Sequence, residues 1–411
     1  MLSTKKQTLI ALSLFFLAAL AGLFLRFLNV NPLDEVNFRY FVHAHSHVAL
    51  LGWIHLALML LINKLVLKNY VPLKVYSRIF YATLFAVVGM LLSFPFQGYA
   101  AISIGFSTLF ILVSYVFYWA FIHYIPKEDR QTSGLKCIRF ALVYMVLSSL
   151  GTWAIGAVMT TLGPVSDWYR IAIYFYLHFQ YNGWMILALV GLILLVFENH
   201  DIYFGKRNFS RFLLTFHVGI LLSFFISVLF TSPPDIFYLL AVIGAALQLM
   251  SFNFLFSFFR KIKWFLLQKF TRLQRNLFRW FVVLLASKLV MQLLAGFPQI
   301  APWITQYKNL SIGFLHWVFL GVTCIGLFLL LDFIGMFKIN LLQFSLYVVA
   351  FLGTEALIFL KPLSNIFDFP LPNNYNWWLF YTSLLLVLVI GSMWMRQIQL
   401  SIKKTTRRQS L

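Results

Sequence analysis

Apolar residues run in long stretches along this chain, and short polar or basic segments separate the stretches. A helix of about 20 apolar residues crosses the hydrocarbon layer of a membrane, so the pattern predicts membrane-spanning helices. We expect about twelve spans, at residues 8–28, 44–67, 77–98, 101–124, 137–161, 171–197, 211–231, 235–258, 277–297, 309–331, 340–361 and 376–396.

The composition supports a membrane environment. Hydrophobic residues make up 62% of the 411 residues and charged residues 10%, against roughly 45–50% and about 25% in soluble domains. Such a chain cannot cover its surface with polar groups in water. We therefore predict an all-α integral membrane protein in a lipid bilayer, with residues 1–411 as a single polytopic bundle. The composition excludes disordered, collagen-like and disulfide-rich proteins.

The distribution of positive charge predicts the orientation of the chain. The formal net charge is +21, and 26 of the 32 Lys and Arg residues fall in the two terminal segments and in every second loop. Basic loops stay on the cytoplasmic side of a membrane, so both termini are predicted to be cytoplasmic. Topology thus accounts for the positive charge, and we predict no nucleic-acid partner.

Histidines mark three of the predicted spans. An imidazole within a bilayer is costly unless it is paired, solvated or bound to a metal. The second, sixth and tenth spans run in the same direction, and each carries a His eight positions after an outer basic residue, which places the His about 12 Å deeper. These pairs are Arg39 and His47, Arg170 and His178, and Lys308 and His316. A glycine follows each His by five positions, at Gly52, Gly183 and Gly321.

The shared depth favours a common haem or metal site, because helical bundles build such sites from facing side chains. For each His alone, a hydrogen bond to a neighbouring helix is the alternative. The second span holds further candidates. His43 and His47 are four residues apart and share a helix face, whereas His45 points to nearly the opposite side. His55 lies two turns beyond His47, and we expect it to be a packed residue.

Three short motifs carry a family resemblance. The segments HAHSHVALLGW at residues 43–53, YLHFQYNGW around His178 and LHWVFLG around His316 resemble the second, sixth and tenth helices of the catalytic subunit of haem–copper oxidases and nitric-oxide reductases. In that twelve-helix family, helices two and ten ligate a low-spin haem, and helix six helps to bind copper or non-haem iron. A related twelve-helix family that responds to nitric oxide is also similar.

The resemblance implies roles for particular residues. His316, together with His45 or His47, would ligate a haem of the b type. His178 would bind copper or non-haem iron, together with His43 or His45.

Other positions depart from the family pattern. Phe224 and Phe225 stand near the place where the family has histidines on helix seven, and phenylalanine cannot ligate a metal. Phe314 occupies the position two residues before the helix-ten His, and Asn182 replaces the tyrosine of the oxidases. We therefore expect an incomplete catalytic centre, and the catalytic residues stay unassigned.

Two functions follow from these patterns. The resemblance implies a haem-binding protein of the bacterial inner membrane, in electron transfer or in the reduction or sensing of oxygen or nitric oxide. A cytochrome or a quinol would donate electrons, and partner subunits are compatible with this role; whether the chain is an oxidoreductase stays open. The alternative is a proton-coupled transporter without haem. Its support is a set of polar residues inside spans: Lys288, Glu355, Gln180, Asn182 and Gln292.

The predicted orientation can be tested with reporters. A reporter fused after Leu411 should remain in the cytoplasm, and one inserted near Asn373 should lie outside, because these points fall on opposite sides of the last predicted span. Paired reporters that are active on only one side of the membrane measure this. Opposite labelling at either point would contradict the orientation.

Overall fold

The computed structural model describes residues 3–409, without the side chains of residues 403–409, and within this range it is helical with no β-strand. Twelve helices in this part of the chain are long and apolar enough to cross a membrane. The predicted number of spans is therefore confirmed.

Eight of the described spans are continuous α-helices: α1 (Thr4–Leu28), α4 (Leu73–Gln97), α5 (Ala101–Tyr124), α6 (Ser133–Thr161), α10 (Asp235–Lys261), α12 (Arg272–Leu294), α16 (Leu341–Ile366) and α17 (Tyr375–Gln409). The seventh span joins α9 (Lys206–Ser223) to the 3-10 segment η5 (Phe224–Thr231). Short helices in the connections are η2 (Leu67–Asn69), η3 (Asp129–Gln131), α11 (Lys263–Lys269) and α13 (Ala301–Gln306).

The second, sixth and tenth spans each contain a π-helical segment. They are α2 (Phe38–His47), η1 (Val48–Ile54) and α3 (His55–Leu65); α7 (Asp167–His178), η4 (Phe179–Ile186) and α8 (Leu187–Glu198); and α14 (Lys308–His316), η6 (Trp317–Thr323) and α15 (Cys324–Phe333). The most apolar windows of these three spans are 83%, 100% and 67% buried, against 33–44% for the other nine. The spans that carry His47, His178 and His316 are thus the three most buried spans, called the inner spans below.

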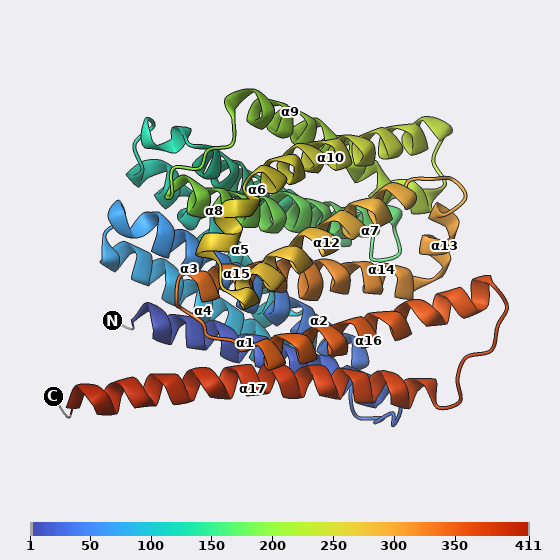
Figure 1. Ribbon diagram of the computed structural model, residues 1–411. Coiled ribbons are helices and arrows are strands. Elements are labelled where there is room, and N and C mark those ends of the chain that lie inside the picture. The colour runs from blue at the N-terminus through green and yellow to red at the C-terminus, as the bar shows by residue number, and fades with distance from the viewer. Residues whose placement is uncertain (1–2, 410–411) are drawn as a thin grey trace. The chain divides into compact units, whose positions relative to one another are not determined.

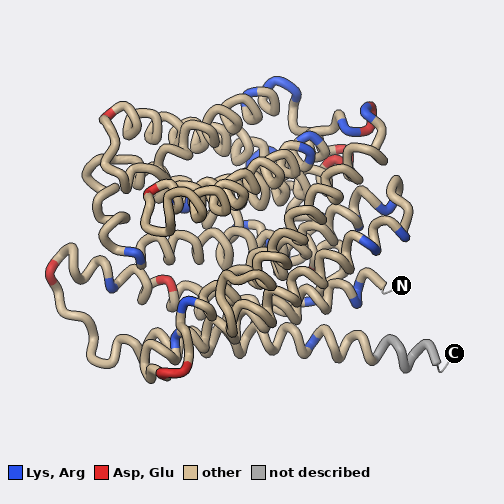
Figure 2. The backbone as a smooth tube through the Cα atoms, turned by 180° about the vertical axis from the view of Figure 1, so that it is seen from behind, with Lys and Arg blue, Asp and Glu red and all other residues tan. Residues whose placement is uncertain are grey.

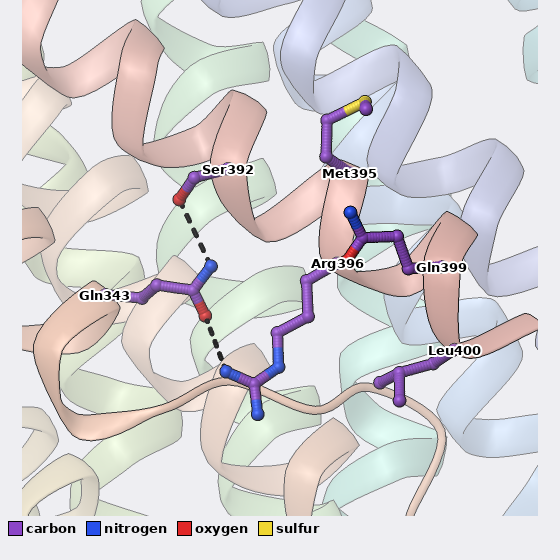
Figure 3. Close-up of a pocket in the computed structure, with 6 residues that line it drawn as sticks. All are labelled: Gln343, Ser392, Met395, Arg396, Gln399 and Leu400. Atoms are coloured by element: carbon purple, nitrogen blue, oxygen red, sulfur yellow. Dashed lines mark hydrogen bonds between the residues drawn. The ribbon is translucent and has the colours of Figure 1, made fainter.

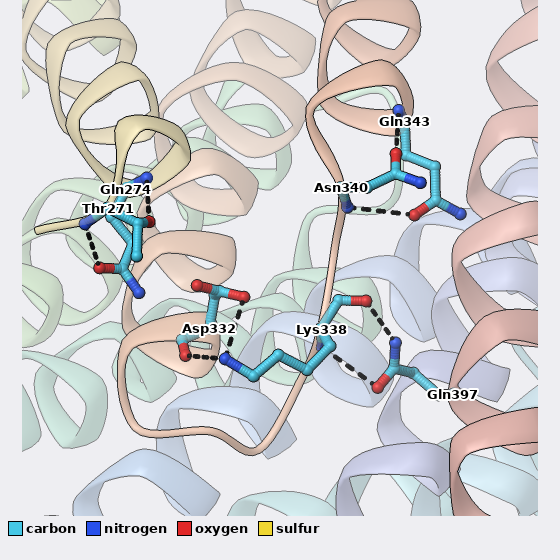
Figure 4. A network of polar contacts seen from close by, with 7 residues as sticks. All are labelled: Thr271, Gln274, Asp332, Lys338, Asn340, Gln343 and Gln397. Atoms are coloured by element: carbon cyan, nitrogen blue, oxygen red, sulfur yellow. Dashed lines mark hydrogen bonds and ion pairs between the residues drawn. The ribbon is translucent and has the colours of Figure 1, made fainter.

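Polar caps set the starts of several helices. Seven spans begin four to six residues before the apolar stretch that predicted them. Asn37 caps α2, Ser166 caps α7, and Thr271 forms a capping box with Gln274 at the start of α12 (Figure 4). These side chains accept hydrogen bonds from amides of the first turn, which have no partner within the helix.

The chain divides into two compact units, residues 1–120 with 327–411 and residues 121–326. In the first unit, α1 packs against α17 and η1, and α16 runs beside α17 (Figure 1). In the second unit, α6 packs against α7, η4 and α8, and α9 runs beside α10. The single domain over residues 1–411 stays a prediction.

Charged residues concentrate at the helix ends. Most Lys and Arg residues lie in the connections and in the first and last turns of the helices, and few lie along their length (Figure 2). This arrangement keeps charge out of the hydrocarbon, where each ionised group would be costly.

Glycines allow α9 and α10 to approach closely. A Cβ atom at Gly219 would lie 2.8 Å from the amide nitrogen of Gln248, and one at Gly244 would collide with the backbone of Leu222 and Ser223. Small residues at such crossings let two helix backbones come together within a membrane.

Replacing Gly244 tests this contact. We expect Gly244→Leu to lower the free energy of unfolding by roughly 1–3 kcal/mol, because the added side chain must push α9 and α10 apart. Thermal unfolding of the purified protein in detergent measures the loss. Gly105→Leu is the matched control, since a Cβ there meets nothing within 4 Å. Equal unfolding temperatures for the two variants would contradict the close approach.

Candidate functional site

One local arrangement recurs in the three inner spans. His47, His178 and His316 are each the last residue of a regular α-helix, and a π-helical segment begins at the next residue. The glycine five positions after each His lies inside that segment. π-Helical turns are rare and occur often at functional sites.

Two of these glycines serve helix packing. A Cβ atom at Gly52 would lie 3.0 Å from the Val87 side chain of α4, and one at Gly183 would lie 2.5 Å from the Tyr144 side chain of α6. The wider π-helical turn therefore lies directly against a neighbouring helix in both units. For Gly52 and Gly183 this supports the packing interpretation.

His47 is held by its own helix. Its Nδ1 lies 2.8 Å from the His43 carbonyl, to which it donates, and its Nε2 lies 3.1 Å from the Tyr99 hydroxyl. The ring packs on Phe94 of α4 with 4.5 Å between centroids. His43 contacts Tyr99 as well, with its ring centroid 4.6 Å from that of Tyr99. The two histidines therefore share a helix face.

His45 points to the other side of the helix, as its spacing predicts. Its Nδ1 lies 2.8 Å from the Ala18 carbonyl of α1. The ring covers Gly22, where an added Cβ would lie 2.8 Å from the His45 Cε1. His55 is buried, with its ring 4.8 Å from that of Phe110. This agrees with a packed role for His55.

The Nδ1 contacts of His45 and His47 suit an imidazole that binds iron through Nε2, although Nε2 of His47 contacts the Tyr99 hydroxyl in this structure. Ligating histidines usually donate the other ring N–H to a carbonyl or a carboxylate, which fixes the tautomer. Both residues make this bond through Nδ1. Their predicted role as alternative haem ligands stays a prediction, as does that of His316, which is partly buried at the end of α14.

The helix around His316 is anchored within the second unit. The Trp317 indole N–H, at the start of η6, lies 3.1 Å from both the Leu284 carbonyl and the Ser287 hydroxyl of α12. This pair of contacts fixes the π-helical turn against α12, directly after His316.

His178 lies in a buried polar network of the second unit. Its Nε2 lies 2.8 Å from the Ile220 carbonyl of α9, and its Nδ1 lies 3.3 Å from the Asn182 side-chain nitrogen. A carbonyl only accepts and an amide NH₂ only donates, so Nε2 carries the hydrogen and Nδ1 accepts. The Asn182 oxygen accepts from the Lys288 amine, which confirms the orientation of the amide.

A second arm of the network starts from the same amine. The Lys288 amine also donates to the Gln292 side-chain oxygen. Gln292 donates to Gln248 of α10 at 3.0 Å, and Gln248 donates to the Ser223 hydroxyl at 2.9 Å. The Ser223 hydroxyl donates to the Ile220 carbonyl at 3.4 Å. His178 donates to the same carbonyl, so the two arms close a ring that joins four spans.

Burial makes this ring costly to break. None of its six side chains is more than 4% exposed: His178, Asn182, Ser223, Gln248, Lys288 and Gln292. Within the described part of the chain, no carboxylate lies within ion-pair distance of Lys288. Instead, the amine lies 5.6 Å from the Tyr181 ring centre and 6.0 Å from that of Phe314. Amide oxygens and ring faces thus surround a buried amine.

Hydrogen-bond partners and an aromatic ring surround His178. Both ring nitrogens already have hydrogen-bond partners, and the Phe224 ring packs 5.7 Å from the imidazole. Among the described residues, no group of three or more His, Cys, Asp or Glu side chains could hold a metal. The predicted sharing of a metal with His43 or His45 stays a prediction.

Several members of the site escaped prediction. Asn182, Lys288 and Gln292 were candidates for a transport path, but Gln248 and Ser223 were not recognised. Pairs four residues apart, such as His178 and Asn182 or Lys288 and Gln292, share a helix face and are the signal for the network. Of the other transport candidates, Gln180 accepts from Ser148 at 2.9 Å, and Glu355 is buried in the first unit.

Comparison with protein-family profiles and with curated proteins finds no match to this chain.

Breaking the ring at Asn182 should destabilise the protein. Asn182→Leu removes the acceptor of Lys288 and the donor to His178, and leaves both groups buried. We expect a loss of about 3 kcal/mol, because each unsatisfied buried group costs roughly 1–3 kcal/mol. Unfolding in detergent measures the loss. Thr160→Val, which changes an exposed polar residue of α6, is the control. Equal stability of the two variants would show that the ring contributes nothing.

Proposed function

We propose that this chain is a haem-binding membrane protein that serves electron transfer or the binding of a diatomic gas. The observation that carries the proposal is the recurrence of a His directly before a π-helical segment in the three most buried spans. Nothing in helix packing requires a His at this position three times. A common cofactor site gives the repeated arrangement a single cause.

His47 and His316 are the proposed axial ligands, with His45 as the alternative to His47. The Nδ1 hydrogen bonds of His45 and His47 make Nε2 the nitrogen that would bind iron, and in His47 the iron would replace the contact of Nε2 with the Tyr99 hydroxyl. Two imidazoles give haem iron a six-coordinate, low-spin state suited to electron transfer. The residues of this chain supply the ligands, and their backbone contacts orient the rings.

Phe224 and Phe225, which stand near the place of the family's helix-seven histidines, favour one haem without a second metal. This supports an electron-transfer or gas-sensing protein over a complete reductase, within the resemblance to haem–copper oxidase subunits. On this proposal the protein lies in a bacterial inner membrane and receives electrons from a cytochrome or a quinol.

A proton-coupled transporter is the second candidate function. The buried ring around Lys288 favours it, because an ionisable residue inside a membrane usually marks a substrate or proton pathway. This candidate requires no haem, so the purified protein would be colourless.

Optical spectra of ligand variants test the haem proposal. The protein purified after expression with ample haem should show a Soret band. His47→Ala and His316→Ala should each produce a high-spin spectrum or lose the haem, because each removes an axial ligand. His45→Ala should change less, because its side chain leaves the helix about 160° from that of His47. His123→Ala is the control, since His123 lies at the last turn of α5.

Two outcomes would contradict this assignment. A colourless protein, or one whose haem content is unchanged in all three variants, would leave the transporter as the better candidate. If His45→Ala has the larger effect, the ligand is His45 and the haem proposal stands. His178→Ala should keep the low-spin spectrum. If this variant loses a non-haem metal, His178 is a metal ligand after all.

A further inference from the structure

A groove opens between the start of α16 and the last part of α17, within the first unit. Its volume is about 470 Å³, and it is lined by Gln343, Ser392, Met395, Arg396, Gln399 and Leu400 (Figure 3). These elements lie on the side that the distribution of basic residues predicts to be cytoplasmic. The groove is remote in sequence from every candidate haem ligand.

Arg396 supplies positive charge to this groove. Its guanidinium is partly buried and reaches the Gln343 side-chain oxygen at 3.5 Å (Figure 3). Among the described residues, no carboxylate forms an ion pair with it. One long hydrogen bond uses only one of the five N–H donors of a guanidinium. The remaining donors and the unbalanced charge favour an anion with several oxygen atoms, such as a phosphate.

The wall of the groove is held firmly. The Gln343 backbone N–H donates to the Asn340 side-chain oxygen at 2.7 Å. The Asn340 backbone N–H donates to the Gln343 side-chain oxygen at 3.3 Å. The Gln343 side-chain nitrogen donates to the Ser392 hydroxyl at 3.1 Å. Gln343 therefore positions Arg396 while it caps α16 and bridges to α17.

The loop before α16 is fixed to α17 as well. Gln397 donates to the Lys338 carbonyl at 2.7 Å and accepts from the Lys338 amide at 3.2 Å (Figure 4). The Lys338 amine lies 3.6 Å from the Asp332 carboxylate, so that positive charge is balanced. Arg396 thus differs from its neighbour Lys338 in lacking a carboxylate partner among the described residues.

The other lining residues suit an amphipathic ligand. Met395 and Leu400 are 48% and 39% exposed and present apolar surface beside the guanidinium. Arg396 is the last residue of the apolar stretch 376–396 that predicts the last span, so we expect it near the level of the lipid headgroups. Four more basic residues follow in the sequence: Lys403, Lys404, Arg407 and Arg408. Clusters of this kind attract anionic lipids.

We propose that this groove binds the headgroup phosphate of an anionic phospholipid. Arg396 contacts the phosphate oxygens, Gln399 and Leu400 line the headgroup space on the cytoplasmic side, and Met395 contacts the upper acyl chains. The binding site is independent of the proposed haem function.

Lipid retention by the full-length protein tests the proposal. Purified protein is titrated with phosphatidylglycerol or phosphatidylcholine in detergent, and bound lipid is counted by native mass spectrometry. We expect a preference for phosphatidylglycerol and a loss of roughly tenfold in its affinity in Arg396→Gln. Arg396→Lys should lose less affinity than Arg396→Gln, because lysine keeps the positive charge. Some affinity should still be lost, because lysine lacks the planar guanidinium. Gln343→Leu should also weaken binding, because it releases the guanidinium.

The control is Arg279→Gln, which removes another basic residue near a helix end but outside the groove. Unchanged unfolding temperature in Arg396→Gln establishes that the variant folds; if it does not fold, Arg396→Lys and Gln343→Leu decide. Equal affinity for the two lipids, or unchanged affinity in Arg396→Gln, would overturn the proposal. Displacement of the lipid by millimolar inorganic phosphate would assign the groove to a soluble anion instead of a lipid.

Discussion

The hydrocarbon of a membrane offers no hydrogen-bond partners, and every spanning segment must therefore satisfy its own polar groups. The backbone meets this constraint by remaining helical across each span. Even the irregular segments η1, η4 and η6 keep a helical ladder, with a wider π-helical turn in place of a break. Among the described residues, the π-helical turns are thus confined to the three most buried spans, where neighbouring helices cover them.

The same constraint governs the polar side chains. Lys288 lies deep in a span, and two amide side chains accept from its amine. The NH₂ groups of those two amides need acceptors of their own. They donate to the His178 ring nitrogen and to the Gln248 side-chain oxygen. Each group that accepts a hydrogen bond also donates one to the next group, until both arms end at the Ile220 carbonyl. A single buried amine thereby ties together α7, α9, α10 and α12.

Hydropathy predicted the twelve spans, because the bilayer imposes a minimum apolar length on each. It placed several helix starts too late, since Asn37, Ser166 and Thr271 begin helices through capping bonds that hydropathy does not measure. Helical spacing correctly predicted that His45 and His47 face opposite sides. The ring around Lys288 was only partly predictable, because spacing pairs residues on one helix but cannot identify Gln248 or Ser223 on another. The haem ligation and the orientation in the membrane stay predictions.

The backbone at Ile220 shows how the ring shapes the seventh span. The amide of Phe224 bonds to the Leu222 carbonyl, and the Ile220 carbonyl is taken by His178 and Ser223 instead. The regular helix ends there and continues as the 3-10 segment η5. The change of helix type thus coincides with the point where the network takes up a backbone carbonyl.

The direction of the hydrogen bonds in the ring has a further consequence. In both arms every donor points away from Lys288 and every acceptor points toward it, so the hydrogen bonds of each arm run in one sense from the amine to the Ile220 carbonyl. Turning over one amide would set its NH₂ against the amine, and the next amide would then have to turn as well. The ring therefore behaves as one ordered array with a permanent polarity, in which no single amide can reorient alone.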